Sequence, residues 1–433
     1  MSTRRLIVLI ALLAAVVGVQ PASAVNSPNM RVNYTVLDQT SGRTHSDIAF
    51  WGNIAVSGNY DGFRVFDTKT QALIRYFPCR GSQGDVSLWN ANGRLLLFLS
   101  NDTPQTNGGT ICSTVRSSDT TACGPPTCFE GIRIFDLSDP ANPVRIASVP
   151  TDCGSHTHTL VPDLANNRVL LYISSYPGGS GPFCQAPFKK ISIVQVPLNA
   201  PETASVLSQP VITGTPPGCH DITVFMAIHK AAASCATEGQ IWDITNPAAP
   251  DTLNAVHVDD PGVNYWHSAE FTWDGQYVVW DDESFTGTCQ PGGDGKIRIY
   301  RVSDAALMSS FMIPRPSGSY CSVHNGNIVP VLGRYLLVAA WYTGGTSVVD
   351  FTNPMNPQEI GYVDQSNGEV WSSYWYNGRI YANDMLRGTD VESIATPYVP
   401  YGQQWSHLNA QTQEDLYIPS ITALGQLRPS PTR

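Results

Sequence analysis

The sequence predicts an all-β protein, a seven-bladed β-propeller of four-stranded antiparallel blades, and three observations lead to this prediction. Residues 321–364 contain four short apolar runs, each of strand length, separated by Gly- and Pro-containing turns. Similar units recur along the chain, and a unit of about 40 residues has to stack on its copies to bury both of its faces. Residues 31–39 resemble the fourth run of the 321–364 unit but have no neighbouring runs of their own.

The units follow one another in order, six with four predicted strands and a seventh with three. They span residues 45–77, 84–149, 153–212, 218–258, 265–314, 321–364 and 369–393. In the fourth unit, residues 226–235 favour a helical turn in place of the second strand. The amino-terminal strand is expected to complete the seventh blade, because a ring closed in this way leaves no exposed sheet edge.

The two ends of the chain are expected to lie outside the propeller, which we place at residues 25–394. Residues 1–24 have a basic start, an apolar run and a small-residue end, which predict a cleavable signal peptide. A membrane anchor is the alternative, and Arg4-Arg5 gives only weak support for a twin-arginine signal. Residues 395–433 form a polar, Pro-containing extension that we expect to wrap the outside or to remain mobile.

Composition and cysteine content favour an exported protein with a large core. The chain has 433 residues, 42% of them apolar and 14% charged, and ten cysteines, all of which follow the predicted signal peptide. An even cysteine count in an exported chain points to disulfides, with free or metal-bound thiols as the alternative. Without Arg4 and Arg5 the mature chain keeps 23 basic against 35 acidic residues, so nucleic acid is not an expected partner. No later segment is long and apolar enough to span a bilayer.

The cysteines precede first strands or lie between second and third strands, which places all ten at one rim. We predict Cys153 with Cys184, Cys219 with Cys235, and Cys289 with Cys321. Cys79 is expected to pair with one of Cys112, Cys123 and Cys128, and the other two with each other. Loops fixed in this way would build a rigid rim over the channel mouth.

Three segments share a turn motif in which an apolar strand ends in Asp and leads into a Pro-bounded turn. They are GIRIFDLSDPANPVRIAS (131–148), GQIWDITNPAAP (239–250) and TSVVDFTNPMNPQEIGYVD (346–364). The motif resembles the LVIVD repeat of bacterial propeller proteins, and the similarity covers roughly residues 45–390. The resemblance implies the propeller fold and export, to the cell envelope or outside the cell, and it implies no activity.

A histidine stands at the start of the first strand in five of the seven units. These are His45, His156, His220, His267 and His324, with His158 as the alternative to His156 in the third unit. First strands line the channel of a propeller, so the five imidazoles should converge, and three or four imidazoles suit a Cu, Fe, Zn or Ni ion. A repeated histidine that bonds only to the neighbouring blade is the structural alternative.

Acidic and aromatic residues accompany the histidines. Glu270 and Asp221 are the candidates for a general base or for an acid that orients an imidazole, with solvated loop carboxylates as the alternative. Asp281-Asp282-Glu283 is a weak candidate for Ca²⁺, because its spacing fits no known loop. Six aromatic residues could wall a pocket or fill blade interfaces: Trp266, Trp341, Tyr342, Trp371, Tyr374 and Trp375.

Two functions remain open. The first is a Cu- or Fe-dependent oxidoreductase with its ion in the histidine ring, in analogy with the axial histidines of carotenoid oxygenases and selenium-binding proteins. The second is a monomeric, non-catalytic exported module that binds a small-molecule or extracellular ligand at the looped rim. The sequence has no Gly-x-Ser-x-Gly elbow, phosphate loop, His-Glu-x-x-His helix or dinucleotide fingerprint, which disfavours hydrolase and nucleotide chemistry.

Overall fold

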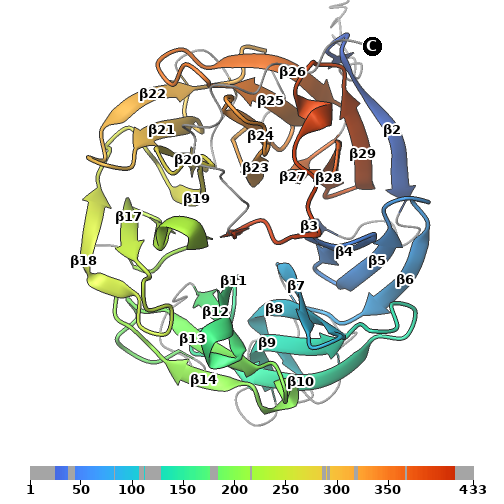
Figure 1. Cartoon of the computed structure of the whole chain (residues 1–433), viewed down its shortest axis with the longest axis vertical. Helices are drawn as coiled ribbons and strands as arrows, with labels where there is room; N and C mark the ends of the chain where they lie inside the picture. Colours follow the sequence, from blue (N-terminus) through green and yellow to red (C-terminus); the bar gives the residue numbers. More distant parts are fainter. Residues whose placement is uncertain are drawn as a thin grey trace, which may run out of the picture.

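The computed structural model confirms the seven-bladed propeller. Seven antiparallel sheets surround a central axis in chain order (Figure 1). The structure describes residues 25–37, 44–81, 83–106, 112, 128–175, 184–214, 217–284, 289, 293–315, 320–365 and 368–414. The predicted signal peptide lies outside these residues.

Each blade is a meander whose first strand lies next to the axis. Blade 1 has β3 (His45–Trp51), β4 (Ile54–Asn59), β5 (Gly62–Asp67) and β6 (Leu73–Pro78), and blade 2 has β7 (Val86–Ala91), β8 (Arg94–Thr106), β9 (Cys128–Asp136) and β10 (Val144–Pro150). Blade 3 has β11 (Thr157–Asp163), β12 (Arg168–Ser174), β13 (Ser192–Pro197) and β14 (Ser205–Ser208), and blade 4 has β15 (Ile222–Phe225), β16 (Lys230–Cys235), β17 (Glu238–Asp243) and β18 (Asp251–Val258). Blade 5 has β19 (Trp266–Phe271), β20 (Tyr277–Asp282), β21 (Ile297–Arg301) and β22 (Leu307–Phe311), and blade 6 has β23 (Gly326–Ile328), β24 (Leu336–Ala340), β25 (Thr346–Asp350) and β26 (Gln358–Asp364). Blade 7 has β27 (Val370–Tyr376), β28 (Arg379–Asp384) and β29 (Gly388–Ile394) from the end of the propeller sequence.

The amino-terminal strand closes the ring, as predicted. β2 (Met30–Leu37) pairs antiparallel with β29 and forms the outermost strand of blade 7. A two-residue strand before it, β1 (Val25–Asn26), pairs with β26 at the outer edge of blade 6. The first and last parts of the propeller sequence are thereby joined by backbone hydrogen bonds.

Hydrophobic cores lie between neighbouring blades. One core joins Leu96 and Ile134 of blade 2 to Leu171 and Val194 of blade 3, and the other blade interfaces are filled in the same way. Both faces of a blade are therefore buried, which explains why many strands are apolar without a clean alternation. In blade 4 the expected helical turn is present at Met226–Ile228, but it precedes the second strand β16 and does not replace it.

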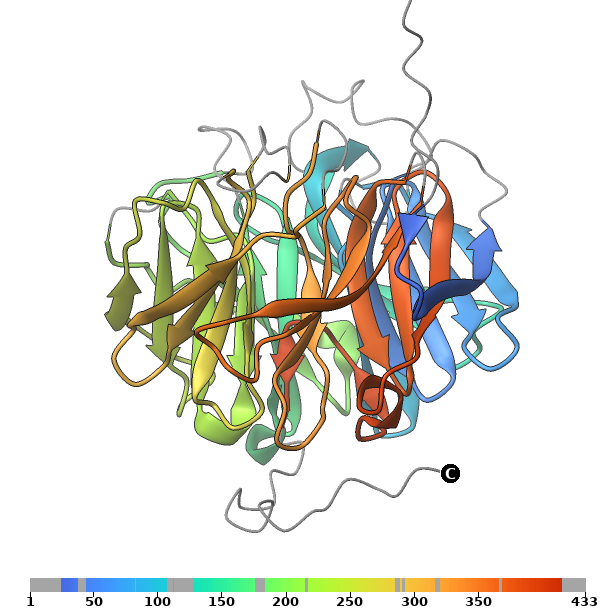
Figure 2. The same cartoon turned by 90° about the horizontal axis from the view of Figure 1, so that it is seen from above.

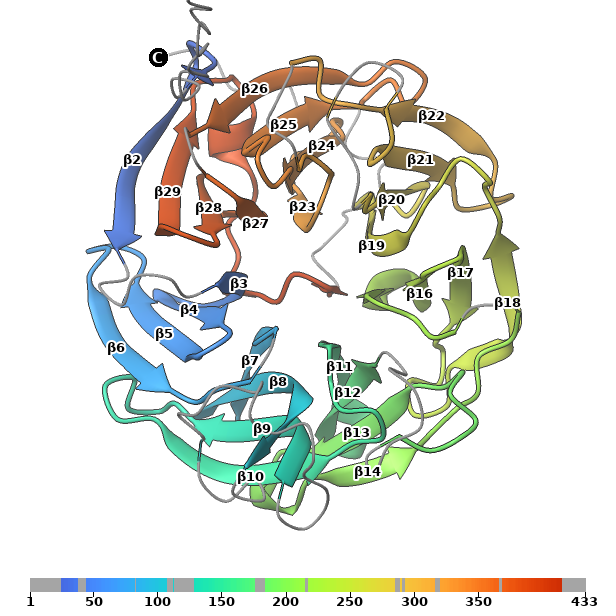
Figure 3. The ribbon, with the colours of Figure 1, turned by 180° about the vertical axis from the view of Figure 1, so that it is seen from behind.

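The carboxyl-terminal segment corrects one expectation. We expected residues 395–433 to wrap the outside or to be mobile, but residues 405–413 cross the central opening (Figures 1 and 3). Residues 415–433 lie outside the described residues. β30 (His407–Leu408) pairs with the end of β3, and β31 (Thr412–Gln413) pairs in parallel with the end of β15. Apolar Trp405, Leu408 and Ala410 are buried there. Because the ends of first strands lie opposite their histidine-bearing starts, the segment closes the far side of the channel.

The disulfide predictions are confirmed where the structure describes both partners. Cys79 pairs with Cys112, and the other three bonds are Cys153–Cys184, Cys219–Cys235 and Cys289–Cys321. Cys128 is disulfide-bonded as well, whereas Cys123 lies outside the described residues. In the described part of the chain, no helix is long and apolar enough to cross a membrane. Figure 2 shows the propeller from the side, with the strands of the blades running between its two ends.

Candidate metal centre

Four of the five predicted histidines meet at one end of the channel. Three of them, from blades 3, 4 and 6, have the same backbone setting, in which the N–H donates to a carbonyl at the end of the second strand of the same blade. The pairs are His156 with Ser174, His220 with Ser234, and His324 with Ala340. His267 is the second residue of β19 in blade 5. The histidines therefore occupy equivalent positions in their blades, and the circular arrangement of the blades makes these positions face one another.

The four imidazoles form a continuous arc. His156 Nε2 lies 3.0 Å from His220 Nε2. The ring centroids of His220 and His267 are 3.9 Å apart, and those of His267 and His324 are 4.0 Å apart. All four side chains are buried. Adjacent blades thus bring their imidazole nitrogens within reach of a common ligand.

Three of these rings are oriented through Nδ1. His156 Nδ1 lies 2.8 Å from Asp102 Oδ2, and His220 Nδ1 lies 2.9 Å from Asp221 Oδ1. His324 Nδ1 lies 2.6 Å from the carbonyl oxygen of Trp371 in the next blade. Carboxylates and carbonyls only accept hydrogen bonds, so each Nδ1 carries the proton and each Nε2 presents its lone pair. Histidines that bind metal ions are oriented by the same kind of contact.

The fourth ring has no such partner. Neither Nδ1 nor Nε2 of His267 has a hydrogen-bond partner among the described residues, although the side chain is buried. Buried polar nitrogens without partners are rare and costly, because the desolvation of the group is not compensated. An unpartnered imidazole between two others is the kind of group that a bound cation would satisfy.

A carboxylate from blade 5 completes the cluster. Glu283 Oε2 lies 3.6 Å from His267 Nε2, and Glu283 Oε1 lies 3.8 Å from His324 Nε2. Tyr342 donates a hydrogen bond of 2.7 Å to Oε1 of this glutamate. The sequence had marked Glu283 only as part of a weak Ca²⁺ candidate. Its position at the end of a second strand, where blade loops rise to the histidine rim, was the available signal.

The electrostatics favour the neutral form of His220, His267 and His324. Burial lowers the pKa of His220, and it lowers those of His267 and His324 well below their usual 6.5, with the neighbouring imidazoles adding to the effect. Burial also raises the pKa of Glu283 to about 7, against the opposing hydrogen bond from Tyr342. Neutral imidazole is the form that binds metal ions.

Two sets of side chains in this cluster have their ligand atoms within 4.8 Å of one another. They are His220 with Asp221 and His267, and His267 with Glu283 and His324. A third set of described residues, Asp152 with Cys153 and Cys184, is excluded because its two sulfurs form a disulfide. The two histidine sets share His267 and so form one potential metal centre. His156 belongs to neither set of the described residues and joins this centre through the 3.0 Å approach of its Nε2 to that of His220.

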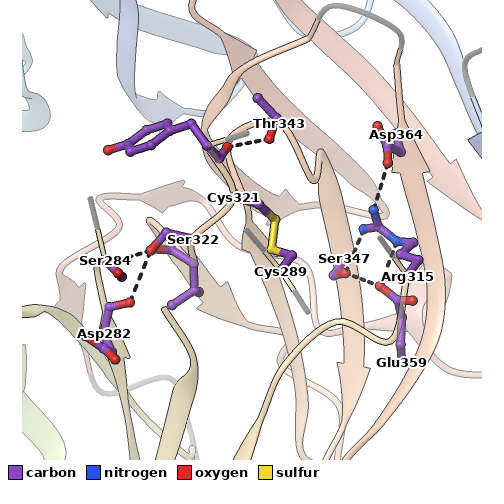
Figure 4. Close-up of a disulfide and its surroundings, with 12 residues drawn as sticks. Asp282, Ser284, Cys289, Arg315, Cys321, Ser322, Thr343, Ser347, Glu359 and Asp364 are labelled. Carbon is purple, nitrogen blue, oxygen red and sulfur yellow. Dashed lines mark hydrogen bonds and ion pairs between the residues drawn. A yellow bond between two sulfur atoms is a disulfide. The ribbon is translucent and has the colours of Figure 1, made fainter. Parts of the chain in front are cut away.

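A disulfide and its neighbours hold the segments that carry Glu283 and His324 (Figure 4). Cys289–Cys321 joins the loop after β20 to the start of blade 6. Ser322 accepts a hydrogen bond of 2.8 Å from the backbone N–H of Ser284 and donates one of 3.2 Å to the carbonyl of Asp282. The residues on both sides of Glu283 are therefore tied to the strand start that presents His324.

The other predicted ligands lie in different surroundings. His45 is buried in blade 1, where its Nδ1 lies 3.3 Å from Ser57 Oγ, and it belongs to neither histidine set of the described residues. His158 contacts Ser87 and Ser100 through its two ring nitrogens at 2.7 and 2.8 Å and pairs with Asp85 at 2.9 Å. This settles the doubt in blade 3: His156 joins the arc, and His158 has a complete hydrogen-bonding environment of its own.

The predicted acids separate into two positions. Asp221 contacts a ring of the arc directly. Glu270 is fully buried in the middle of β19, and burial together with the charges of Asp281, Asp221 and Asp47 raises its pKa well above 4.5. Glu270 belongs to neither histidine set among the described residues.

The six aromatic candidates also divide. Tyr342 and Trp371 contact His324, with ring centroids 4.7 and 4.6 Å from the imidazole. The remaining four are members of the hydrophobic cores: Trp266, Trp341, Tyr374 and Trp375. The structure adds Tyr320, whose ring centroid lies 4.5 Å from that of Tyr342.

Comparisons with known proteins bear on the fold alone. No protein-family model matches the chain, and no curated protein matches it. Raptor from Chaetomium thermophilum is similar in structure, with a TM-score of 0.52 and 15% identity over 86% of this chain and 30% of that chain. The computationally designed protein Ika8 aligns with a TM-score of 0.46 and 12% identity over 83% of this chain and 99% of that chain. At such identities these likenesses assign the chain to no family.

Proposed function

We propose that the chain binds one transition-metal ion, Cu, Fe or Zn, with His156, His220, His267 and His324 at the channel mouth. With Cu or Fe bound, the protein would act as a metal-dependent oxidoreductase. Glu283 stands beside the arc as a further ligand or as a proton acceptor. Asp102 and Asp221 serve as positioning residues that fix the tautomers of His156 and His220.

The observation that carries this proposal is the approach of two Nε2 atoms. His156 and His220 each direct Nδ1 to a carboxylate, and their Nε2 atoms are 3.0 Å apart. Two lone pairs at this distance repel each other unless a proton or a cation lies between them. Burial opposes the proton, since it lowers the pKa of His220. Two nitrogens bound to one ion at about 2.0–2.1 Å are naturally separated by roughly 3 Å.

The donor set suits borderline and softer transition ions better than Ca²⁺ or Mg²⁺. Imidazole is a common ligand of Zn, Cu, Fe and Ni, whereas the hard ions prefer oxygen. Copper or iron would supply one-electron chemistry at a site whose other walls are aromatic and largely buried. The chain's own residues would hold the ligands rigidly, keep water out and move a proton at Glu283.

Export and family membership belong to the same proposal. Four described disulfides suit an oxidising compartment, and the amino-terminal sequence has the features of a signal peptide. The Asp- and Pro-containing turns resemble those of the LVIVD-repeat propellers. We propose a secreted or cell-envelope bacterial protein of that type that acts as a monomer.

A second candidate is a non-catalytic binding propeller, and one observation favours it. His324 bonds through Nδ1 to blade 7, and Thr157 of blade 3 donates to the carbonyl of His220 in blade 4. These contacts tie adjacent blades together without a metal. In this case the ligand would lie on the disulfide-fixed rim, and the imidazoles would be structural.

Elemental analysis of protein purified without an affinity tag separates the two candidates. The metal centre predicts near-stoichiometric Cu, Fe or Zn that is lost in the double variant His220→Ala, His267→Ala. The matched control is His158→Ala. It removes a buried imidazole of blade 3 that is not part of the arc, and it should leave the metal content unchanged. A folded, metal-free wild-type protein that takes up none of these ions on dialysis would support the binding module. Redox cycling of the loaded protein then tests the oxidoreductase.

A further inference from the structure

Aromatic rings surround the entrance to the histidine arc. Trp371 lies against His324, and the ring of Tyr60 from blade 1 stands edge-on to Trp371 with centroids 6.1 Å apart. Tyr320 and Tyr342 of blade 6 continue this wall on the other side of His324. Tyr60 and Tyr320 are partly exposed, whereas the imidazoles are buried. The surface that a ligand meets first is therefore made of aromatic side chains.

Groups from three other blades act on the hydroxyl of Tyr60. Its pKa is raised by burial first, and then by the charges of Asp102 and Glu283 and by Tyr320. Tyr320 has its pKa raised to about 12 by burial and by Glu283, with Glu369 adding to the effect. Glu283 contacts the aromatic wall directly, because the hydroxyls of Tyr320 and Tyr342 lie 3.4 and 2.7 Å from its Oε1.

Carboxylates dominate the charges of this entrance. Glu130 has its pKa raised to about 8, by burial and by nearby Asp102 and Asp152. Described cations at the same end of the blades are paired with acceptors: Arg64 with Asp61, Arg133 with Asn101, and Lys190 with Asp152. Acids whose proton affinity is raised by one another's charge are stabilised by a cation and destabilised by an anion.

We infer that the entrance binds a small organic cation, an amine or methylated ammonium group, between Tyr60, Trp371 and Tyr320. The faces of the rings attract a cation through their quadrupoles, and pockets of several aromatic rings recognise alkylated ammonium groups in this way. Glu283 and Asp102 supply the counter-charge. Binding of this cation needs no metal. Only its role as the substrate of the metal centre rests on the proposed function.

Choline and its neutral carbon isostere 3,3-dimethylbutan-1-ol are the probes that isolate the charge. Isothermal titration of the full-length protein, its disulfides intact and its metal removed by a chelator, should give choline binding about tenfold or more tighter than binding of the isostere. Trp371→Leu and Tyr60→Leu should each weaken choline binding about tenfold. Tyr60→Phe keeps the ring and should retain most of the affinity. Tyr401→Leu, which alters a tyrosine that is 79% exposed, should have no effect.

Equal affinity for the two probes, or no choline binding by a folded wild-type protein, would overturn the inference. Thermal unfolding of each variant identifies any that lose affinity through misfolding, and Tyr60→Phe against Tyr60→Leu then decides the role of the ring. The same titration on His220→Ala, His267→Ala keeps the two proposals apart. That variant should lose the metal and still prefer choline to the isostere. In the wild-type protein, choline selectivity without metal uptake would overturn the metal centre alone, and metal uptake without choline selectivity would overturn this inference alone.

Discussion

His156 and His220 face each other through their Nε2 atoms at 3.0 Å, although they are 64 positions apart in the sequence. Each ring is held from behind by an aspartate, Asp102 for the first and Asp221 for the second. The two rings come from equivalent positions in neighbouring blades, so the contact is a direct product of the repeat. It is also the contact on which the metal proposal depends.

Removal of the charge behind His156 should weaken metal binding without removing a ligand. Asp102→Asn keeps the size of the side chain but no longer fixes the Nδ1 proton of the ring. Such orienting contacts are typically worth about 10–100-fold in metal affinity. Competition with a chromophoric chelator measures the change.

Asp85→Asn is the matched control for this experiment. Asp85 pairs with His158 in the same way, at 2.9 Å, but His158 lies outside the arc. Its replacement should leave the metal affinity within about twofold of the wild type, a small change beside the roughly 10–100-fold loss expected for an orienting contact. Equal losses in both variants would mean that a general change in the channel, and not the orientation of His156, lowers the affinity.

Loss of the disulfide beside His220 should lower both stability and metal affinity. Cys219–Cys235 joins two cysteines with a sequence separation of 16, and Cys219 directly precedes His220. Cys219→Ser with Cys235→Ser is expected to cost about 2–4 kcal/mol in the free energy of unfolding. Urea unfolding and the chelator competition measure the two effects. Cys79→Ser with Cys112→Ser should lower stability but leave metal affinity unchanged, since no residue of the arc adjoins that bond.

The carboxyl-terminal segment should stabilise the propeller through its contacts with first strands. The side chain of Asn409 accepts a hydrogen bond from the N–H of Leu88 and donates one to the carbonyl of the same residue. Asn409→Ala leaves both buried backbone groups unpaired, at a cost of about 1–3 kcal/mol each. Urea unfolding should show this loss, whereas Gln404→Ala, at an exposed position of the same segment, should change stability little. Equal stability of Asn409→Ala and wild type would contradict the claim that these two hydrogen bonds stabilise the propeller.

Glu392 should make stability fall as the pH rises. Burial, followed by the charge of Asp390, raises its pKa well above 4.5, and its Oε2 has no hydrogen-bond partner among the described residues. Between the unfolded and folded pKa values the folded chain binds more protons, so this contribution to stability is complete below about pH 4.5 and is lost as the pH rises through the folded value.

Glu392→Gln removes this titration and keeps the acceptor for Thr346. The variant should therefore gain stability relative to wild type as the pH rises above about 4.5, as measured by urea unfolding over a series of pH values. Glu202→Gln, whose side chain is 52% exposed, should follow the wild type. A parallel pH profile for wild type and Glu392→Gln would show that folding does not raise the pKa of this carboxyl.

The fold could be predicted from the sequence because every unit repeats the same local pattern. Turn residues, strand-length apolar runs and the unpaired strand at residues 31–39 were sufficient to give seven blades and their closure. Three of the disulfide pairs followed from the same alignment, since the pattern places both partners at one rim, whereas Cys79 was left with three possible partners, of which the structure shows Cys112. The path of residues 405–413 could not be predicted, because their anchoring depends on first-strand backbone groups that no local pattern marks.

The candidate site could be predicted in part. The repeat alignment placed His156, His220, His267 and His324 together, but it could not distinguish them from His45, whose described contact is Ser57. Glu283 was missed as a ligand because it follows a second strand, while the alignment considered first-strand starts. The rotamers that bring its carboxylate to His267 and His324 depend on Tyr342 and on the segment fixed by Ser322, which are tertiary contacts.

The metal centre is tested most directly by anomalous X-ray scattering from crystals of the metal-loaded protein, recorded on both sides of the absorption edge of the bound element. The account predicts one strong peak at about 2.0–2.3 Å from the Nε2 atoms of His156 and His220, on the side that faces His267 and His324. Crystals grown with the same ion that give no peak at these nitrogens, or give one only at another site, would contradict it.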